Sequence, residues 1–190
     1  MLQAQQITRK LKDFGRVKDL YIEAFPKSER APMAFLFHIA RKDTVKFNAY
    51  YDKGVFVGFT YTIIVDDMTY LLYFAVESGL RSKGYGAQIL SCIQEQYPSN
   101  QIILNIEIED EKADNNADRI RRKNFYLKNG YSLTTIYFEM NGNTYDVLVS
   151  NGKCTADEFR YLCKKYMGAL PFALYRPKIR ENEEVEANKK

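Results

Sequence analysis

Residues 70–87 read YLLYFAVESGLRSKGYGA, an apolar run followed by a basic turn that contains two glycines. The aromatic and aliphatic first half is typical of a strand, and a helical pattern follows the turn. Glycines at positions 84 and 86 leave the backbone open where a polyanion would approach. The start of the helix adds unpaired N–H groups, and Arg81 and Lys83 add positive charge. This stretch therefore predicts a phosphate-binding turn between a strand and a helix.

The turn matches neither of the two common nucleotide-binding motifs. It lacks the Gly-x-Gly-x-x-Gly spacing of dinucleotide sites and the Gly-Lys-Ser/Thr ending of a P-loop. A turn that only starts a helix is the plain alternative, but the flanking strand and helix indicate a different phosphate ligand.

Two segments carry a resemblance to a known family. The pattern Arg81-x-x-Gly84-x-Gly86, after a strand that ends in Phe-Ala-Val, resembles the signature of the GNAT superfamily of acyl-CoA N-acyltransferases. Downstream, residues 124–131 read NFYLKNGY and are similar to a second segment of that family. The two motifs occur in the family's order, and the expected order of elements matches that family over nearly all of residues 1–150.

The resemblance implies a site for acetyl-CoA. The strand end would pair with the pantetheine arm, and a backbone N–H at Val76 would hold the thioester carbonyl. The residues expected to bind the cofactor are Phe74, Ala75, Val76, Arg81, Ser82, Lys83, Gly84, Tyr85, Gly86 and Ala87. A further hypothesis is that Asn115, Arg119 or Lys123 reaches the phosphates of CoA, because cations near a polyphosphate gain charge-assisted hydrogen bonds.

The resemblance also implies direct transfer of an acetyl group to an amine, without a covalent enzyme intermediate. Tyr126 matches the family tyrosine that donates a proton to the sulfur of CoA. A phenol suits this role because its ordinary pKa of about 10 keeps it protonated at neutral pH. An aromatic residue at helical spacing can equally be part of the core, which is the alternative for Tyr126.

The general base is less clearly marked. The strand that begins at Tyr70 lacks the internal glutamate that some relatives use. Glu107 is the preferred candidate, as base through a water molecule or as counter-ion to an ammonium group, and Asn105 on the same strand face would contact the acceptor. Glu77 is a further candidate for the acceptor site. Solvated surface carboxylates are the alternative, and the single histidine, His38, is expected to be packed in the core rather than catalytic.

The amino-acid composition limits the classes of protein to which the chain can belong. The chain has 190 residues, 46% hydrophobic and 14% aromatic, which suits one globular domain. Three cysteines without a Cys-x-x-Cys pair and a single histidine argue against a metal site. No long apolar run or leader is present, so we expect a cytoplasmic protein without membrane contact. The net charge of +4 is modest, and the basic cluster at residues 119–123 makes a nucleic-acid partner a possibility that no motif supports.

The pattern of strands and helices predicts an α+β (mixed α/β) fold. We expect a central, mixed but mostly antiparallel, twisted sheet of about seven strands flanked by helices, with strands 70–76 and 101–109 parallel around a helix. One domain would span residues 1–170, with a core over 1–150 and a C-terminal helix over 155–167. Thr155 and Glu158 form a capping-box pattern at its start. A charged, loose tail would follow over residues 177–190.

The predicted function is N-acetyl transfer from acetyl-CoA to an amine of a small molecule or peptide through a ternary complex. The alternative from another class is a non-catalytic acyl-CoA-binding sensor. Polyamine, aminoglycoside, amino-acid and protein acceptors all stay open at this point, as does the choice between monomer and homodimer. No metal and no nucleic acid are expected.

Overall fold

The structure, a computed structural model, describes residues 2–181. Contacts divide the chain into two compact units. Unit 1 comprises Met1–Ile64 and Leu71–Pro98, and unit 2 comprises Val65–Tyr70 and Ser99–Lys190.

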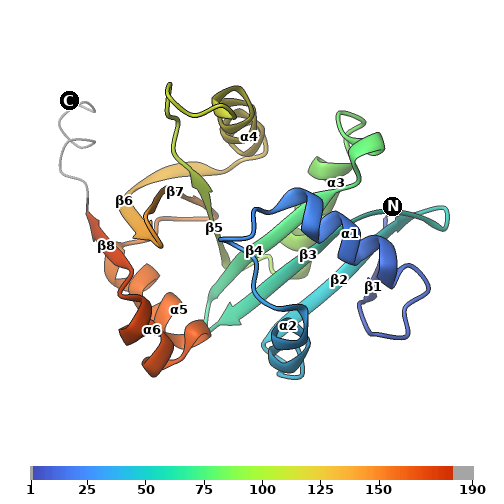
Figure 1. Cartoon of the computed structure of the whole chain (residues 1–190), viewed down its shortest axis with the longest axis horizontal. Coiled ribbons are helices and arrows are strands. Elements are labelled where there is room, and N and C mark those ends of the chain that lie inside the picture. The colour runs from blue at the N-terminus through green and yellow to red at the C-terminus, as the bar shows by residue number, and fades with distance from the viewer. Residues whose placement is uncertain (1, 182–190) are drawn as a thin grey trace. The chain divides into compact units, whose positions relative to one another are not determined.

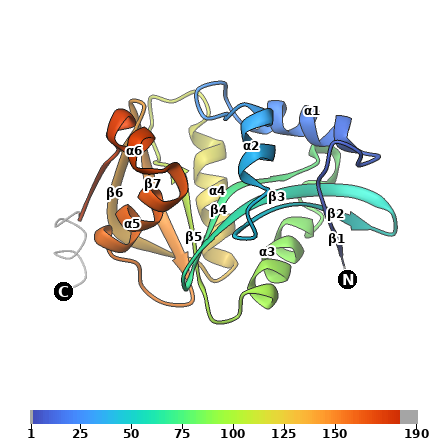
Figure 2. The same ribbon diagram turned by 90° about the horizontal axis from the view of Figure 1, so that it is seen from below.

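Unit 1 is built on long antiparallel strands. Its helices α1 and α2 lie over one face of these strands and α3 lies over the other, as Figures 1 and 2 both show. Buried aromatic rings such as Phe47, Phe56 and Phe59 fill the space beneath the helices. The elements are β1 (Gln3–Gln6), α1 (Phe14–Ala24), α2 (Met33–Ile39), β2 (Val45–Asp52), β3 (Val55–Val65), the greater part of β4 (Met68–Val76), the 3₁₀ turn η1 (Ser78–Leu80) and α3 (Tyr85–Gln96).

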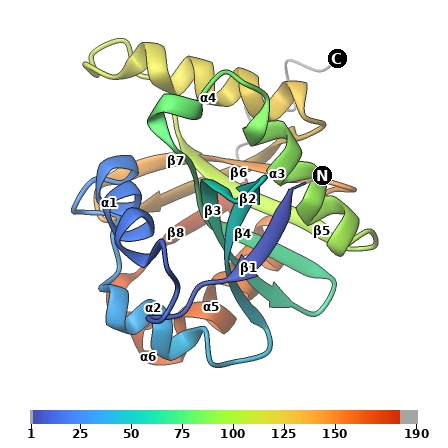
Figure 3. The same cartoon turned by 90° about the vertical axis from the view of Figure 1, so that its right-hand side faces the viewer.

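Unit 2 begins with the first residues of β4, which pair in parallel with β5, so that Tyr70 lies opposite Ile103. Helix α4 lies on one side of its strands, and α5 and α6 lie on the other (Figures 1 and 3). The elements are β5 (Gln101–Glu107), α4 (Asn116–Lys128), β6 (Ser132–Met140), β7 (Asn143–Ser150), α5 (Ala156–Met167), α6 (Ala169–Tyr175) and β8 (Lys178–Glu181).

The sheet confirms the predicted fold class. Its eight strands follow the order β1-β2-β3-β4-β5-β7-β6-β8. The parallel pairing of β4 with β5 is confirmed, whereas the pairs β1–β2, β2–β3, β5–β7, β6–β7 and β6–β8 are antiparallel.

The C-terminal region differs in part from the prediction. The capping box of α5 is confirmed, because the Thr155 side chain accepts from the Glu158 N–H and the Glu158 side chain accepts from the Thr155 N–H. Helix α6 and strand β8 were not predicted, and the loose tail predicted from residue 177 is wrong in part. Residues 178–181 instead form a strand paired with β6, and the remainder of that tail lies outside the described residues. One domain over residues 1–170 stays a prediction.

Candidate functional site

The predicted phosphate turn is an exposed loop that leads into α3. Gly84 is the N-cap of this helix and has a φ of 82° in the left-handed region, which side chains other than glycine's rarely adopt. Across the described residues, the backbone N–H groups of Tyr85, Gly86 and Ala87 donate to no other group, and the first backbone bond of the helix runs from Gln88 N–H to the Gly84 carbonyl. Three free donors at the positive end of a helix form a site that suits a phosphate.

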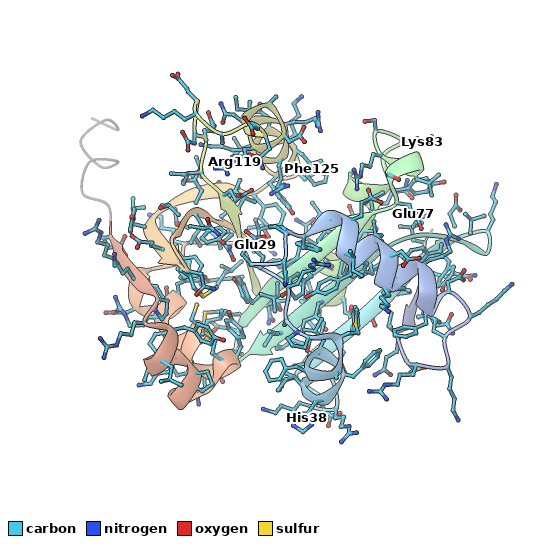
Figure 4. The ribbon with its side chains drawn as sticks, viewed as in Figure 1. Glu29, His38, Glu77, Lys83, Arg119 and Phe125 are labelled. Carbon is cyan, nitrogen blue, oxygen red and sulfur yellow. The ribbon has the colours of Figure 1, made fainter. Side chains whose placement is uncertain are left out.

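The two cations of the turn fold back onto the protein. Arg81 donates from Nε to the Val76 carbonyl at 3.2 Å and forms an ion pair with Glu23 of α1 at 2.9 Å. Lys83 donates from Nζ to the Gly79 carbonyl at 3.0 Å, and its side chain is exposed beside the turn (Figure 4). These bonds brace the loop, and both side chains lie at the surface, where rearrangement costs little.

The start of α3 is also tied to the β2–β3 hairpin. The Tyr85 hydroxyl donates to Asp52 Oδ2 at 2.8 Å, and this hydrogen bond raises the pKa of Tyr85. Asp52 was not predicted as part of the site, because its sequence context indicates only a hairpin turn. The contact fixes the first residue of the helix relative to the strands of unit 1.

The end of β4 is closely packed against β3. A Cβ atom added at Gly58 would lie 2.3 Å from the Ala75 carbonyl oxygen, so only glycine fits there without movement of the backbone. Ala75 is buried, while Phe74 and Val76 are half-buried. Gly58 therefore sets the position of the strand end that leads into the turn.

Glu77 follows β4 directly and pairs with Arg16 of α1 at 3.0 Å. The Arg16 guanidinium also lies 3.7 Å from Asp13 and 5.2 Å from the centre of the Phe56 ring. His38 is exposed near the end of α2, at the opposite end of unit 1 from Glu77 (Figure 4). The expectation that His38 is packed in the core was wrong, because α2 buries Leu36 and turns His38 outward.

In unit 2, Tyr126 lies on the buried side of α4 and is 7% exposed. Its ring packs against Phe125 at 5.2 Å and Tyr131 at 5.6 Å between centroids. Burial raises the pKa of Tyr126 to about 12, with the positive charge of Arg122 acting in the opposite direction. The Tyr126 hydroxyl has no hydrogen-bond partner among the residues that the structure describes. The phenol is therefore protonated at neutral pH and free to donate.

Glu107 stands at the end of β5 and is held by two arginines of α4. Its Oε1 accepts from Arg119 at 2.9 Å, and its Oε2 lies 3.8 Å from Arg122. Arg119 also donates to the Ile108 carbonyl at 2.9 Å and to Asn115 Oδ1 at 2.9 Å. Figure 4 labels Arg119 on the α4 side of this unit. The Glu107 carboxylate is thus compensated by positive charge within the protein.

Lys123 of α4 is also paired with carboxylates of the protein. Its Nζ lies 3.1 Å from Glu109 and 3.2 Å from Asp146, and hydrogen bonds to these carboxylates outweigh burial and raise its pKa. Asn105, on β5, accepts a short hydrogen bond at Oδ1 from the Tyr70 hydroxyl. Among the site residues predicted in unit 2, Glu107, Arg119 and Asn115 form one hydrogen-bonded network, in which Arg119 donates to the other two.

No group of three or more His, Cys, Asp or Glu side chains that could hold a metal ion occurs among residues 2–181. Within the same range, every helix is too short or too polar to cross a membrane.

The sheet is mixed, with β4 and β5 parallel, and helix α3 starts at a glycine turn after β4. A model of the acetyltransferase (GNAT) family matches residues 14–131, which is more than half of the chain. The chain therefore belongs to the acetyltransferase (GNAT) family, and it is an acetyltransferase. No curated protein matches the sequence.

Solved structures share the fold at low sequence identity. A putative GNAT-family acetyltransferase from Bacteroides thetaiotaomicron is 22% identical, with a TM-score of 0.72 over 91% of this chain and 98% of its own. An aminoglycoside 6'-N-acetyltransferase complexed with coenzyme A is 18% identical, with a TM-score of 0.62 over 78% and 96%. The ribosomal-protein-S18-alanine N-acetyltransferase of Escherichia coli is 14% identical, with a TM-score of 0.56 over 82% and 96%.

Proposed function

We propose that this protein transfers the acetyl group of acetyl-CoA to an amine of a small molecule or peptide within a ternary complex. In this reaction the amine nitrogen bonds to the acetyl carbon, the carbon–sulfur bond breaks, and one proton passes from nitrogen to sulfur. The products are an N-acetyl amine and free CoA. The observation that carries the proposal is the turn before α3, where three N–H groups without a partner in residues 2–181 lie beside a left-handed Gly84.

Bound acetyl-CoA would supply a thioester, whose acetyl group is already activated toward an amine. The turn residues Arg81–Ala87 would hold its phosphates through backbone N–H groups, and residues 74–76 would hold its arm. Asn115, Arg119 and Lys123 stay predicted phosphate contacts. Because all three have protein partners, binding through them requires those contacts to open.

The proposed catalytic roles rest on the chemistry of the individual side chains. Tyr126 would donate a proton to the sulfur, since its burial keeps the phenol protonated. Glu107 would take the proton of the amine through a water molecule, with Asn105 as an acceptor contact and Glu77 as a further candidate. Two arginines lie beside the Glu107 carboxylate, at 2.9 and 3.8 Å. The aminoglycoside and alanine N-acetyltransferases among the structural neighbours are consistent with an amine acceptor.

The test is a thiol-release assay with acetyl-CoA and a panel of primary amines. We expect amine-dependent release of CoA, and Tyr126→Phe should lower kcat by about 10²-fold, as loss of a general acid does. Tyr131→Phe is the matched control, because it removes a neighbouring phenol whose buried hydroxyl has no partner within the described residues. Binding of acetyl-CoA without any amine-dependent release would replace transfer with the role of a non-catalytic sensor.

A further inference from the structure

Tyr70 and Asn105 form a contact that fixes the orientation of a side-chain amide. Tyr70 is 1% exposed, and its ring packs against Phe159 at 6.1 Å and Tyr166 at 5.4 Å, both on α5. Its hydroxyl donates to Asn105 Oδ1 on the neighbouring strand. Because the ring is held by α5, the hydroxyl has a fixed place, and the Asn105 amide is held with its oxygen toward Tyr70.

This orientation leaves the nitrogen of the amide available. Asn105 is half-buried, and in the part of the chain that the structure describes its Nδ2 donates to no other group. This nitrogen is not one of the buried side-chain atoms without a partner, so it is open to solvent and can donate to a bound oxygen atom. Asn105 therefore presents N–H donors, and its carbonyl oxygen is already occupied.

Glu107, two residues further along β5, has different surroundings from Asn105. Its carboxylate is held by Arg119 and Arg122 of α4, whereas Asn105 contacts Tyr70, whose ring packs on α5. Both carboxylate oxygens of Glu107 lie near arginine, and Arg122 makes only a 3.8 Å contact while 44% of its side chain stays exposed. The Glu107 carboxylate is thus already compensated by arginine and is not a free carboxylate for a polycation, and the Asn105 amide is the group on β5 that offers hydrogen-bond donors.

We propose that Asn105, positioned by Tyr70, selects amine acceptors that carry a carbonyl or carboxylate oxygen on the carbon next to the amino group. This inference rests on the acetyl transfer proposed above and narrows its acceptor. Free amino acids and peptide N-termini share this chemistry, whereas polyamines lack it. Asn105 is a binding residue in this account, and Tyr70 is a positioning residue that acts through it.

The experiment compares acceptors that differ at one group. Alanine, alaninamide, isopropylamine and 1,4-diaminobutane are assayed by thiol release at equal concentrations of free amine. We expect kcat/KM for alanine or alaninamide to exceed that for isopropylamine and the diamine by about tenfold or more, the order of one to two hydrogen bonds. A preference for alanine indicates a free amino acid, and one for alaninamide a peptide N-terminus.

Variants then assign the preference to the proposed contact. Asn105→Leu and Tyr70→Phe should each raise KM for the preferred acceptor about tenfold, while KM for isopropylamine stays the same. The kcat of Tyr70→Phe should change less than its KM, because the phenol touches no reacting atom. Tyr50→Phe is the control, since it also removes a buried tyrosine hydrogen bond, to Thr60 at 3.2 Å, and it should change neither value.

The outcomes separate the two proposals. If the wild type acetylates isopropylamine or the diamine as well as alaninamide, the oxygen selection is wrong and acetyl transfer stands. Equal effects of Asn105→Leu on all acceptors also overturn the selection. If no amine releases thiol, the proposed transfer fails and the selection fails with it.

Discussion

Tyr126 combines a buried ring with a hydroxyl that bonds to no described residue, and this has a consequence for pH dependence. Its pKa of about 12 lies above the ordinary value, and the protonated phenol is the form that donates. Activity should therefore be lost only as pH rises toward 12, and not near 10, where an ordinary phenol ionises. We predict that kcat at saturating amine stays level between about pH 8.5 and 10.5.

The matching measurement is the kcat profile of the wild type beside that of Tyr126→Phe. A fall of the wild-type kcat near pH 10, absent from the variant, would contradict the proposed state of Tyr126. Circular dichroism at each pH provides the control that the protein stays folded.

Arg119 should matter for stability as well as for the site. Its side chain is 16% exposed, and its guanidinium donates to Glu107, Ile108 and Asn115. Arg119→Ala removes these bonds and should lower the free energy of unfolding by about 2 kcal/mol. Arg121→Ala, whose side chain is 76% exposed and pairs with Asp118, should change it by less than about 0.5 kcal/mol. Equal values from urea unfolding would show that the Arg119 network contributes nothing.

Those parts of the candidate site that consist of residues close together in the sequence could be predicted. The glycine turn and the Tyr126 segment each depend on neighbouring residues, so spacing alone indicates them. The partners of these residues could not be predicted, because Glu23 and Arg81 are 58 positions apart, and nothing in either segment marks the pairing. The Tyr70–Asn105 contact was missed for the same reason, since it depends on strand register.

At the scale of elements, β3 packs closely against the end of β4 at Gly58. Gly58→Ala would place a Cβ atom 2.3 Å from a backbone oxygen of Ala75, and strands of a sheet cannot move apart without loss of hydrogen bonds. We predict a loss of roughly 1–3 kcal/mol in the free energy of unfolding. Gly15→Ala is the matched control in α1, because no atom lies within 4 Å of its added Cβ, and it should leave stability unchanged or raise it by up to about 1 kcal/mol. Similar losses in both variants would contradict the packing argument.

The elements themselves were predictable where side chains determine local geometry. The hairpins after β2 and β6 and the capping box of α5 follow from turn and cap residues, and the alternation of β5 follows from its half-buried position. Helix α6 and strand β8 were missed because both are short. β8 has four residues and only Ile179 buried, so pairing with β6 rather than local pattern makes it a strand.

At the scale of the whole molecule, buried tyrosines make stability sensitive to alkaline pH. Burial raises the pKa of Tyr50 and Tyr126 to about 12 and raises those of Tyr21, Tyr61 and Tyr131 further. The unfolded chain loses these protons above pH 10 while the folded chain keeps them. The stabilisation that comes from keeping these tyrosines protonated is therefore complete below pH 10. It decreases above pH 10, by about 1 kcal/mol per tyrosine between about pH 10 and 11.

Urea unfolding between about pH 8 and 11 measures this decrease, and tyrosinate absorbance of the folded protein reports how many phenols stay protonated. A free energy of unfolding that stays constant across this range would contradict the burial of these hydroxyls.

The most direct test of the account is a calorimetric titration of the protein with acetyl-CoA, repeated with Gly84→Glu and with Gly142→Glu. Both glycines have positive φ, 82° and 79°, so both substitutions strain the backbone, but only the first adds bulk and negative charge to the phosphate turn. The account predicts a Kd of about micromolar order for the wild type and Gly142→Glu, and loss of binding for Gly84→Glu. Absence of binding to the wild type, or an equal Kd in all three proteins, would contradict the assignment of the turn as the site for acetyl-CoA.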